Sequence, residues 1–534
     1  MNRNFFTNYR TLAGHVWRLN RVQIPVWVVS IAAFSVIMAA FLPTLFPEGP
    51  ERQIIAQTME NPAMISMLGP GYGLANYHMG AIMAHQMLLL TAVTVAIMNI
   101  LITIRCTRRD EEQGRIEMIR SLPVGKLANA ASVFLVLTLT NIVLGLTVGI
   151  GLALLGLEGM DWLGSLTYGA VLTAAGIFFS AASLFFAQLT ETARAASAYS
   201  FGFLGLSYLL RAVGDIGSEP LSLISPLGLV LRSQVYVNNY WWPLVVTLSA
   251  AVLVTLAAFK LNTLRDLEAG FIAAKPGRKH ASPLLLSPMG LVLRLEKTTL
   301  IGWAVGLFVL GASYGSVFGE VENFIETSEL YQQMLPTIPG FSYLDLFVAM
   351  LLSIMSMIAA IPALLVMLKL RSEEKANRTE HLLARSVSRA RLMGSYTAVA
   401  LITAAIMQVV SVLGLWTAAA AVVEDPFALG EVLAGALAYV PLIWILIGLA
   451  AALIGSAPAK AGLTWLYLGF TFFVMFFGKM MQLPEWMAKL TPWGYIPDVP
   501  LEPINSGSLI LTILAAAGLI GIGLYGYGKR DIYG

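Results

Sequence analysis

The chain contains 534 residues, of which 57% are hydrophobic and only 12% are charged, and its formal net charge at pH 7 is +3. Soluble globular proteins carry roughly 45–50% apolar and about 25% charged residues, so this composition excludes a soluble globular fold. It predicts an all-α polytopic membrane protein and implies no nucleic-acid partner. The single cysteine, Cys106, excludes an intramolecular disulfide.

Twelve stretches of the chain contain no Asp, Glu, Lys or Arg. About 20 apolar residues cross the ~30 Å hydrocarbon layer as a helix, and nearly every stretch reaches that length. The shortest, Ala195–Leu210, is flanked by Arg194 and Arg211, whose side chains we expect to reach the membrane surface. We therefore predict twelve transmembrane helices, over Ile24–Pro47, Asn61–Ile104, Leu127–Leu157, Trp162–Thr190, Ala195–Leu210, Ser233–Phe259, Thr298–Gly319, Leu346–Leu368, Leu392–Val423, Val432–Ala459, Ala461–Gly478 and Pro503–Gly528.

The Lys and Arg residues are distributed unequally between the two sides of the predicted membrane. With the N-terminus inside, 28 of the 33 fall in cytoplasmic segments. The five others are Arg52, Arg211, Arg232, Lys479 and Lys489. Cytoplasmic loops are enriched in Lys and Arg, so both termini are predicted to be cytoplasmic.

Two charged segments interrupt the apolar chain and align without a gap at a spacing of 263 residues. The first island, Arg108–Lys126, lies between the second and third spans, and the second island, Arg371–Arg389, lies between the eighth and ninth. Their match indicates an internal repeat. Because six spans separate equivalent points, the halves share one orientation, which excludes inverted-repeat transporter folds. The predicted division is a six-span half at 1–270, a cytoplasmic linker at 271–285 and a second six-span half at 286–534.

Each half is predicted to contain further matching elements. An amphipathic basic segment, 5–21 or 284–297, precedes the first span and suits an interfacial helix. An apolar outer segment, 211–240 or 479–507, suits short re-entrant helices in the outer leaflet. Three pairs of short sequences also match: Arg18-Leu-Asn-Arg with Arg294-Leu-Glu-Lys, Ser225-Pro-Leu-Gly with Thr491-Pro-Trp-Gly, and Arg265-Asp-Leu with Arg530-Asp-Ile.

Acidic and basic residues in both islands have helical spacing. Glu111 and Arg115, and likewise Glu374 and Arg378, are four residues apart with the acid first, which is the favourable order on a helix. We therefore predict a short amphipathic helix in each island. A single loop of this kind is equally compatible with a solvated turn whose charges set the topology. Recurrence in both halves favours a docking surface for a soluble partner.

These elements together resemble the ABC-2 type exporter permeases, and the fused twelve-span arrangement is similar to the bacterial tetronasin and polyketide-antibiotic exporters. The matching residues of the first island are Glu111, Gly114, Arg115, Glu117, Pro123 and Val124. Those of the second island are Glu374, Arg378, Glu380, Val387, Ser388 and Arg389. The second island departs from the pattern, with Asn377 in place of the glycine and Ser386 in place of the proline.

The resemblance implies that the islands are coupling helices docked on two copies of a soluble ABC ATPase. It implies a multi-pass protein of the bacterial plasma membrane, surrounded by lipid, that exports a hydrophobic small molecule such as an antibiotic, a drug or a lipid-like compound. The chain has no Gly-x-x-x-x-Gly-Lys-Ser/Thr motif. ATP and magnesium are therefore expected in the partner ATPase, and no cofactor is expected in this chain.

Two other classes of protein are alternatives to an ABC-2 type exporter permease. An ion-coupled carrier of the major facilitator type also has twelve spans in two parallel halves, but the charge-free stretches hold no carboxylate to carry a proton. His85 is the remaining candidate for a proton relay, although a lone histidine near the end of a helix is more often a packed or hydrogen-bonded residue. An intramembrane enzyme needs clustered ligands or acids, and the five histidines are scattered, so no catalytic residue and no metal site is predicted.

Aromatic and methionine side chains in two spans suit an apolar substrate. We predict a substrate cavity lined by residues of the second and eleventh spans. The alternative is that these side chains pack against other helices or lipid. The candidate lining residues are Met87, Asn99, Phe470, Phe473 and Phe477.

Overall fold

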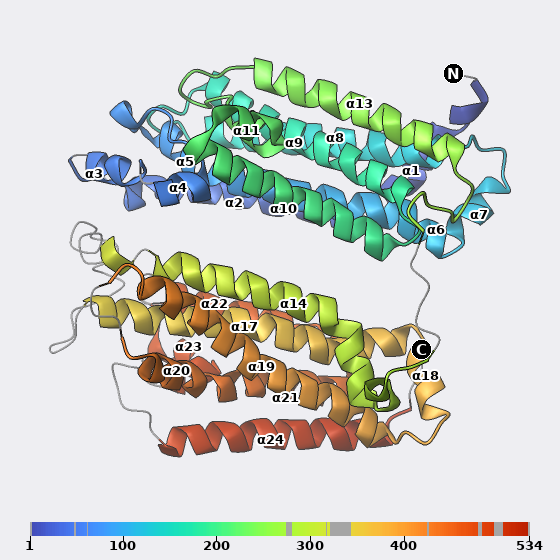
Figure 1. The fold of residues 1–534 in the computed structure, drawn as a ribbon, viewed down its shortest axis with the longest axis vertical. Helices are drawn as coiled ribbons and strands as arrows, with labels where there is room; N and C mark the ends of the chain where they lie inside the picture. Colours follow the sequence, from blue (N-terminus) through green and yellow to red (C-terminus); the bar gives the residue numbers. More distant parts are fainter. Residues whose placement is uncertain are drawn as a thin grey trace. The chain divides into compact units, whose positions relative to one another are not determined.

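The computed structural model describes residues 3–46, 50–60, 62–273, 280–316, 318–320, 343–423, 427–478, 483–495 and 506–531. The chain forms two compact units, Met1–Gly277 and Arg278–Gly534, whose boundary falls inside the predicted linker. In the described ranges the regular structure is helical, and the long helices of each unit run alongside one another (Figure 1).

Unit 1 consists of long helices joined by short ones. The long helices are α2 (Gln23–Leu45), α5 (Met79–Ile104), α8 (Ala128–Ala153), α9 (Trp162–Leu189), α10 (Ala193–Gly217) and α13 (Trp242–Leu264). The shorter helices are α1 (Tyr9–Leu19), α3 (Pro50–Thr58), α4 (Pro62–Leu68), α6 (Asp110–Glu112), α7 (Arg115–Arg120), α11 (Glu219–Ile224) and α12 (Pro226–Leu231).

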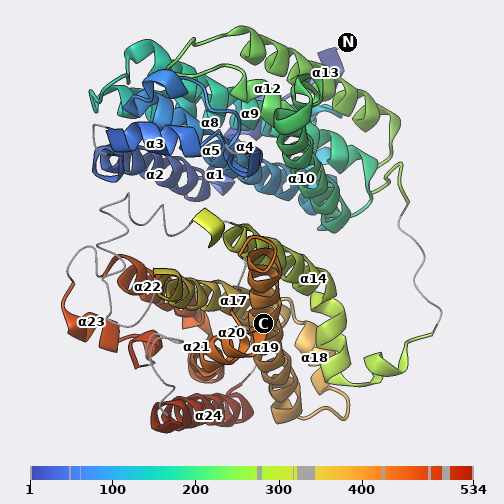
Figure 2. The same ribbon diagram turned by 60° about the vertical axis from the view of Figure 1, so that its left-hand side comes forward.

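Unit 2 repeats this arrangement (Figure 2). Its long helices are α14 (Pro288–Gly315), α17 (Tyr343–Lys375), α19 (Arg389–Ala419), α20 (Leu429–Ala438) followed by α21 (Val440–Ser456), α22 (Leu463–Phe477) and α24 (Ser506–Lys529). The short helices are α18 (Arg378–Leu383) and α23 (Glu485–Lys489).

Membrane-spanning helices account for most of the described chain. Eleven helices in the described ranges are long and apolar enough to cross a membrane, with α20 and α21 counted as one. The predicted fifth span corresponds to α10, whose 25 residues reach about 37 Å at 1.5 Å per residue. Its sequence includes Arg194, Arg211 and Asp215, which lower its hydropathy. The twelve predicted spans are thus eleven apolar helices and one long helix that carries charges.

The expectation that Arg211 reaches the membrane surface is wrong. Its side chain is completely buried and lies 3.5 Å from the Asp215 carboxylate. Its guanidinium donates to the main-chain carbonyls of Ile65 and Ser66 at 3.2 and 2.9 Å. These carbonyls belong to the end of α4, so Arg211 caps that helix while Asp215 balances its charge.

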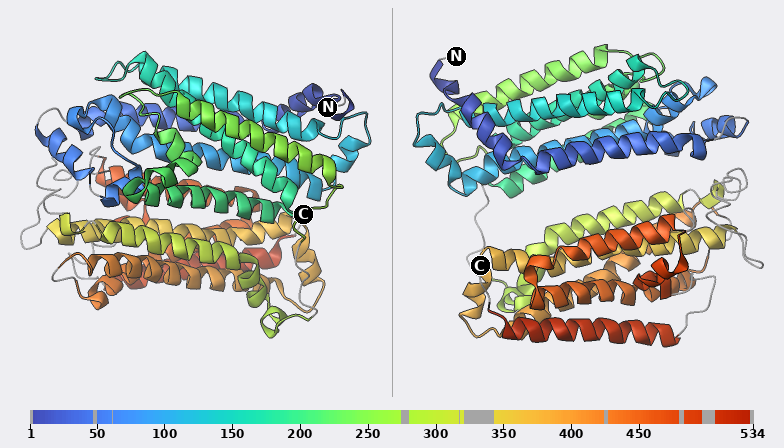
Figure 3. Two further views of the ribbon diagram at one scale, coloured as in Figure 1. Left: turned by 45° about the horizontal axis from the view of Figure 1, so that its top comes forward. Right: turned by 180° about the vertical axis from the view of Figure 1, so that it is seen from behind.

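The two units share one packing order, which supports the repeat. In unit 1, α2 packs on α8, α5 packs on α9, and α9 packs on α13. In unit 2 the matching pairs are α14 with α19, α17 with α21, and α21 with α24. Figure 3 shows the long helices of both units from two further sides. Three equivalent pairs of long helices therefore pack together in both units.

The predicted interfacial segments differ between the halves. In the first half, Tyr9–Leu19 forms the separate helix α1 ahead of α2. In the second half, the helix that begins at Pro288 continues without a break to Gly315. Residues 284–297 are therefore not a separate interfacial helix, because most of them form the first turns of α14.

A matched turn occurs in the predicted outer segment of each unit. The Ser225 hydroxyl accepts a hydrogen bond from the Gly228 amide at 3.3 Å and begins α12. A Cβ atom added to Gly228 would lie 2.2 Å from the Ser222 carbonyl oxygen. A Cβ atom on Gly494 would lie 2.2 Å from the Ala488 carbonyl oxygen. Both glycines thus permit the turn to press against the preceding short helix.

Candidate functional site

Both islands consist of a helix end, a left-handed residue and a short second helix. In the first island, Gly114 (φ 70°) separates α6 from α7. In the second island, Asn377 (φ 57°) separates α17 from α18. Glycine adopts positive φ without a steric penalty, and asparagine is one of the few other residues that tolerates it. The departure from the pattern at Asn377 therefore preserves the same turn.

Neither predicted ion pair forms, whether Glu111 with Arg115 or Glu374 with Arg378. Arg115 contacts Asp110 at 2.8 Å, and Arg378 contacts Glu373 at 3.2 Å. The left-handed residue lies between the acid and the base in both islands. It interrupts the continuous helix on which the four-residue spacing depends, so the neighbouring acid becomes the partner.

Glu111 and Glu374 instead form a matched ion pair in each unit. Glu111 accepts a hydrogen bond from Arg265 at 2.7 Å, and both side chains are less than a tenth exposed. Glu374, completely buried, accepts from Arg530 at 2.5 Å. Arg265 directly follows α13, and Arg530 directly follows α24. We call these pairs the first and second clamps, since each fixes an island to the last long helix of its unit.

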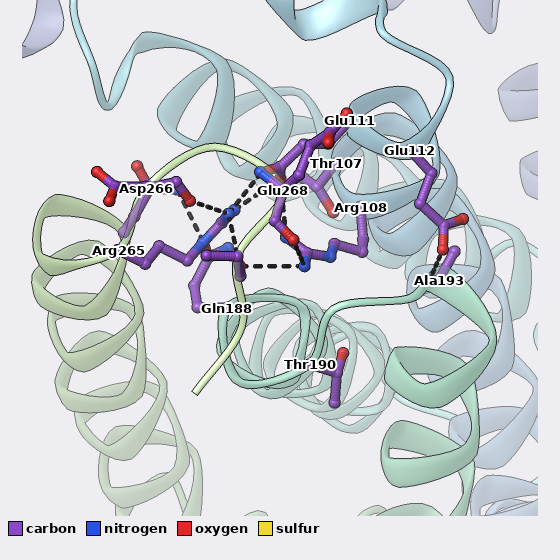
Figure 4. A network of polar contacts seen from close by, with 12 residues as sticks. Thr107, Arg108, Glu111, Glu112, Gln188, Thr190, Ala193, Arg265, Asp266 and Glu268 are labelled. Carbon is purple, nitrogen blue, oxygen red and sulfur yellow. Dashed lines mark hydrogen bonds and ion pairs between the residues drawn. The ribbon is translucent and has the colours of Figure 1, made fainter. Parts of the chain in front are cut away.

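The first clamp has additional partners (Figure 4). Arg108, whose side chain is completely buried, lies 3.2 Å from the Glu111 carboxylate. It also donates to the Glu268 carbonyl oxygen at 2.7 Å. Arg265 Nε donates to the Gln188 side-chain oxygen at 2.8 Å, in the last turn of α9. One carboxylate thus joins two guanidinium groups, and their network connects the first island with α9 and α13.

Charged side chains of the islands also cap helix ends. Glu112 accepts from the first main-chain amide of α10 at 2.9 Å. Lys126 donates to the Thr263 carbonyl oxygen at the end of α13, at 2.9 Å. Arg389, the residue equivalent to Lys126, donates to the Arg530 carbonyl oxygen after α24, at 2.8 Å. The helix dipole favours a carboxylate at the amino end and a cation at the carboxyl end. Arg389 therefore holds the end of α24, rather than extending into the predicted docking surface.

One matched contact differs in chemistry between the units. Asn20 donates to the Cys106 sulfur at 3.3 Å. At the equivalent positions, Glu296 and Lys369 form an ion pair at 3.6 Å. Lys369 also lies 3.5 Å from Glu373, which pairs with α18. In unit 1, the residues before α2 are therefore linked to the helix end that leads into the first island by a neutral contact. In unit 2, the start of α14 is linked to the second island by a chain of ion pairs.

The residues predicted for partner docking divide into exposed and buried sets. The buried ones are Glu111 and Glu374, while Gly114 occupies the turn and Arg389 is half-buried. The exposed ones are Arg115, Glu117, Pro123, Arg378 and Glu380. The exposed set is confined to α7, α18 and the residues that directly follow α7, so a soluble partner can contact only these parts of the predicted set.

Sequence reasoning missed both clamps, although one signal was present. The matched tripeptides beginning at Arg265 and Arg530 recur at equivalent places in the two halves. Their partners lie 154 and 156 residues earlier in the chain. The spacing of residues in the sequence gives no sign of contacts over such distances. The repetition of the two arginines is therefore visible in the sequence, but their acidic partners are not.

Two of the buried polar residues in α5 make internal contacts. Asn99 and Asn141 exchange hydrogen bonds between their side-chain amides at 2.9 and 2.8 Å, which joins α5 to α8. His85 lies 2.9 Å from the Tyr77 hydroxyl and 3.1 Å from the Gly69 carbonyl oxygen. The interpretation of His85 as a packed, hydrogen-bonded residue is confirmed.

The other candidate cavity residues have varied environments. Met87 packs partly against the core of unit 1. In α22, Phe470 is half-buried and Phe473 is 43% exposed. The side chain of Phe477 lies outside the described residues. Among the residues that the structure describes, no group of His, Cys, Asp and Glu could hold a metal ion.

Comparison with known proteins places this geometry in a family of transporters. The family described as "Multidrug efflux system permease Rv1217c, C-terminal domain" matches residues 10–261 and 285–528. The multidrug efflux system permease protein Rv1217c of Mycobacterium tuberculosis (strain ATCC 25618 / H37Rv) is 32% identical over 539 residues, covering 99% of this chain and 96% of that protein. The chain therefore belongs to the multidrug efflux permease family, as a multi-pass membrane protein with a transport function.

Proposed function

We propose that this chain is the permease subunit of an ATP-driven exporter of the ABC-2 type. Two copies of a soluble ABC ATPase, which hold the ATP and magnesium, bind the exposed faces of α7 and α18 from the cytoplasm. The observation that supports this most strongly is the pair of clamps. In each unit, a buried ion pair joins the helix end directly before the exposed short helix to the end of the last long helix.

The clamps suit the transmission of force from a soluble partner. The first island follows α5 through a helical turn at Arg105–Arg109, and the second begins within the continuous helix α17. The clamps also attach each island to the end of the last long helix of its unit, α13 or α24. Separating a buried ion pair leaves charges without partners, at a cost of about 3–5 kcal/mol. Displacement of α7 or α18 is therefore passed to the second and sixth spans of its half.

The proposed cargo is a hydrophobic small molecule, in keeping with the multidrug efflux relative. Met87, Phe470, Phe473 and Phe477 are proposed to contact it, since aromatic and thioether side chains adapt to varied apolar ligands. Asn99 is left out, because its amide is bonded to Asn141. The bacterial plasma membrane, with both termini in the cytoplasm, agrees with the distribution of Lys and Arg.

A charge reversal on the exposed helices tests this function. The double variant Glu117→Arg with Glu380→Arg changes one exposed carboxylate on each helix. We expect it to insert and fold normally but to lose binding of the ATPase and ATP-dependent drug efflux from cells or vesicles. Lys489→Glu, an exposed charge reversal at the predicted outer end of unit 2, is the control. ATPase binding and efflux that both survive the double reversal would contradict the proposal.

A further inference from the structure

The tips of the two islands have different surface chemistry. Met118 and Leu122 of the first tip (112–123) are 69% and 59% exposed, so large apolar side chains face outward there. At the equivalent positions of the second tip (375–386), the exposed side chains are His381 and Arg385. Both tips contain the same turn, and each carries an acid at the equivalent position, Glu117 in the first tip and Glu380 in the second.

The two tips also differ in net charge. Counting Asp, Glu, Lys and Arg, residues 112–123 carry a net charge of zero, and residues 375–386 carry +2. Lys375, Arg378 and Arg385 are all exposed, against the single carboxylate of Glu380. In the first tip, Glu112 replaces the lysine and bonds the start of α10. The first tip thus exposes two large apolar side chains and has no net charge, whereas the second exposes polar side chains at those positions and is cationic.

We propose that the two tips bind the same ATPase surface through different interactions. This inference rests on the function proposed above. The partner surface is a cleft with an apolar floor, a cation that meets the shared acid at Glu117 or Glu380, and carboxylates along the rest of its rim. Met118 and Leu122 contact the floor, while Arg378 and Arg385 contact the rim. Salt does not weaken the burial of apolar side chains, whereas attraction between exposed charges is screened within about 10 Å at 0.1 M salt. The two contacts therefore differ in their dependence on ionic strength.

A cytoplasmic lipid surface is the other possible occupant of an exposed apolar tip. Two observations favour the protein partner. Glu117 is adjacent to Met118 and exposed, and the anionic inner leaflet repels a carboxylate. The equivalent tip of unit 2 exposes no large apolar side chain at the two positions, although it belongs to the same repeat.

Permeases with only one intact tip test the proposal. Met118→Glu with Leu122→Glu leaves the second tip, and Arg378→Glu with Arg385→Glu leaves the first. Binding of the purified ATPase to each full-length variant in lipid nanodiscs is measured at 50 and 500 mM NaCl. For the protein with only the second tip, we expect affinity to fall about tenfold or more in high salt. For the protein with only the first tip, the change is expected to stay below about threefold, because Glu117 alone makes a charged contact there.

The outcomes separate this inference from the function on which it rests. Equal salt dependence in the two variants overturns the inference and leaves the exporter intact, provided that the wild type binds the ATPase. If the wild type binds no ATPase, the proposed function fails and this inference fails with it. If Met118→Glu with Leu122→Glu leaves ATPase binding unchanged but lowers association of the detergent-solubilised protein with anionic vesicles, the first tip contacts lipid and the proposal is wrong. Converting the first tip with Met118→His and Leu122→Arg should confer the salt dependence of the second.

Discussion

The substitution Glu111→Gln tests whether the first clamp holds the island in place. The change keeps the size of the side chain but leaves Arg108 and Arg265 without their shared carboxylate, and both guanidinium groups are buried. Removing one partner from a buried ion pair costs about 3–5 kcal/mol. In the second clamp, Arg530 is 15% exposed, and Arg371, which lies 3.8 Å from the same Glu374 carboxylate, is 30% exposed. Water can hydrate them, so Glu374→Gln should cost only about 1–3 kcal/mol.

Cys106 provides the assay, because it is the only cysteine and is buried next to the first island. Labelling of its thiol by a maleimide reports local opening of this part of unit 1. Each 1.4 kcal/mol changes an opening equilibrium about tenfold, so a loss of about 3 kcal/mol should accelerate labelling about 100-fold. Glu374→Gln lies in the other unit and is the matched control, with labelling close to wild type. Labelling of Glu111→Gln within about threefold of wild type would refute the reasoning.

Three further predictions concern the turn, the buried amides and one histidine. Gly114→Ala should destabilise the protein by about 1–2 kcal/mol, because φ is 70° there, while Asn377→Gly should be close to neutral in thermal denaturation. Asn99→Leu alone leaves the buried Asn141 side-chain oxygen without its donor, at a cost of about 1–3 kcal/mol; adding Asn141→Leu should recover most of the loss in a double-mutant cycle. Burial lowers the pKa of His78, which precedes α5 and accepts from its Ala81 amide as the neutral ring. Its contribution is therefore complete above the unfolded pKa of about 6.5 and is lost as the pH falls through the lowered folded value. His78→Asn retains an acceptor that does not titrate, so the melting temperature of wild type relative to this variant should fall on acidification.

The spans and the repeat were predictable from sequence because they depend on local properties. A run without charged residues predicts a membrane helix wherever it occurs, and the gapless match of the islands required no knowledge of contacts. Both signals are contained within short stretches of chain. They were sufficient for the helical architecture, which the structure confirms.

The charged contacts were not predictable, for identifiable reasons. The four-residue rule chose Glu111 and Glu374 because it assumes a continuous helix, whereas Gly114 and Asn377 interrupt it. The arginines that form the clamps with those acids lie more than 150 residues away. The contact of Arg211 with the carbonyl groups of α4 was not predictable, because no residue near Arg211 in the sequence indicates it.

The ratio of drug exported to ATP hydrolysed tests most directly whether the clamps transmit force. The double variant Arg265→Lys with Arg530→Lys keeps both charges but removes the planar guanidinium, which bonds each carboxylate in a fixed geometry. In proteoliposomes that contain the permease and the proposed partner ATPase, we expect ATPase binding and ATP hydrolysis to be retained while drug exported per ATP falls at least about tenfold. A wild-type ratio in the double variant would contradict the account.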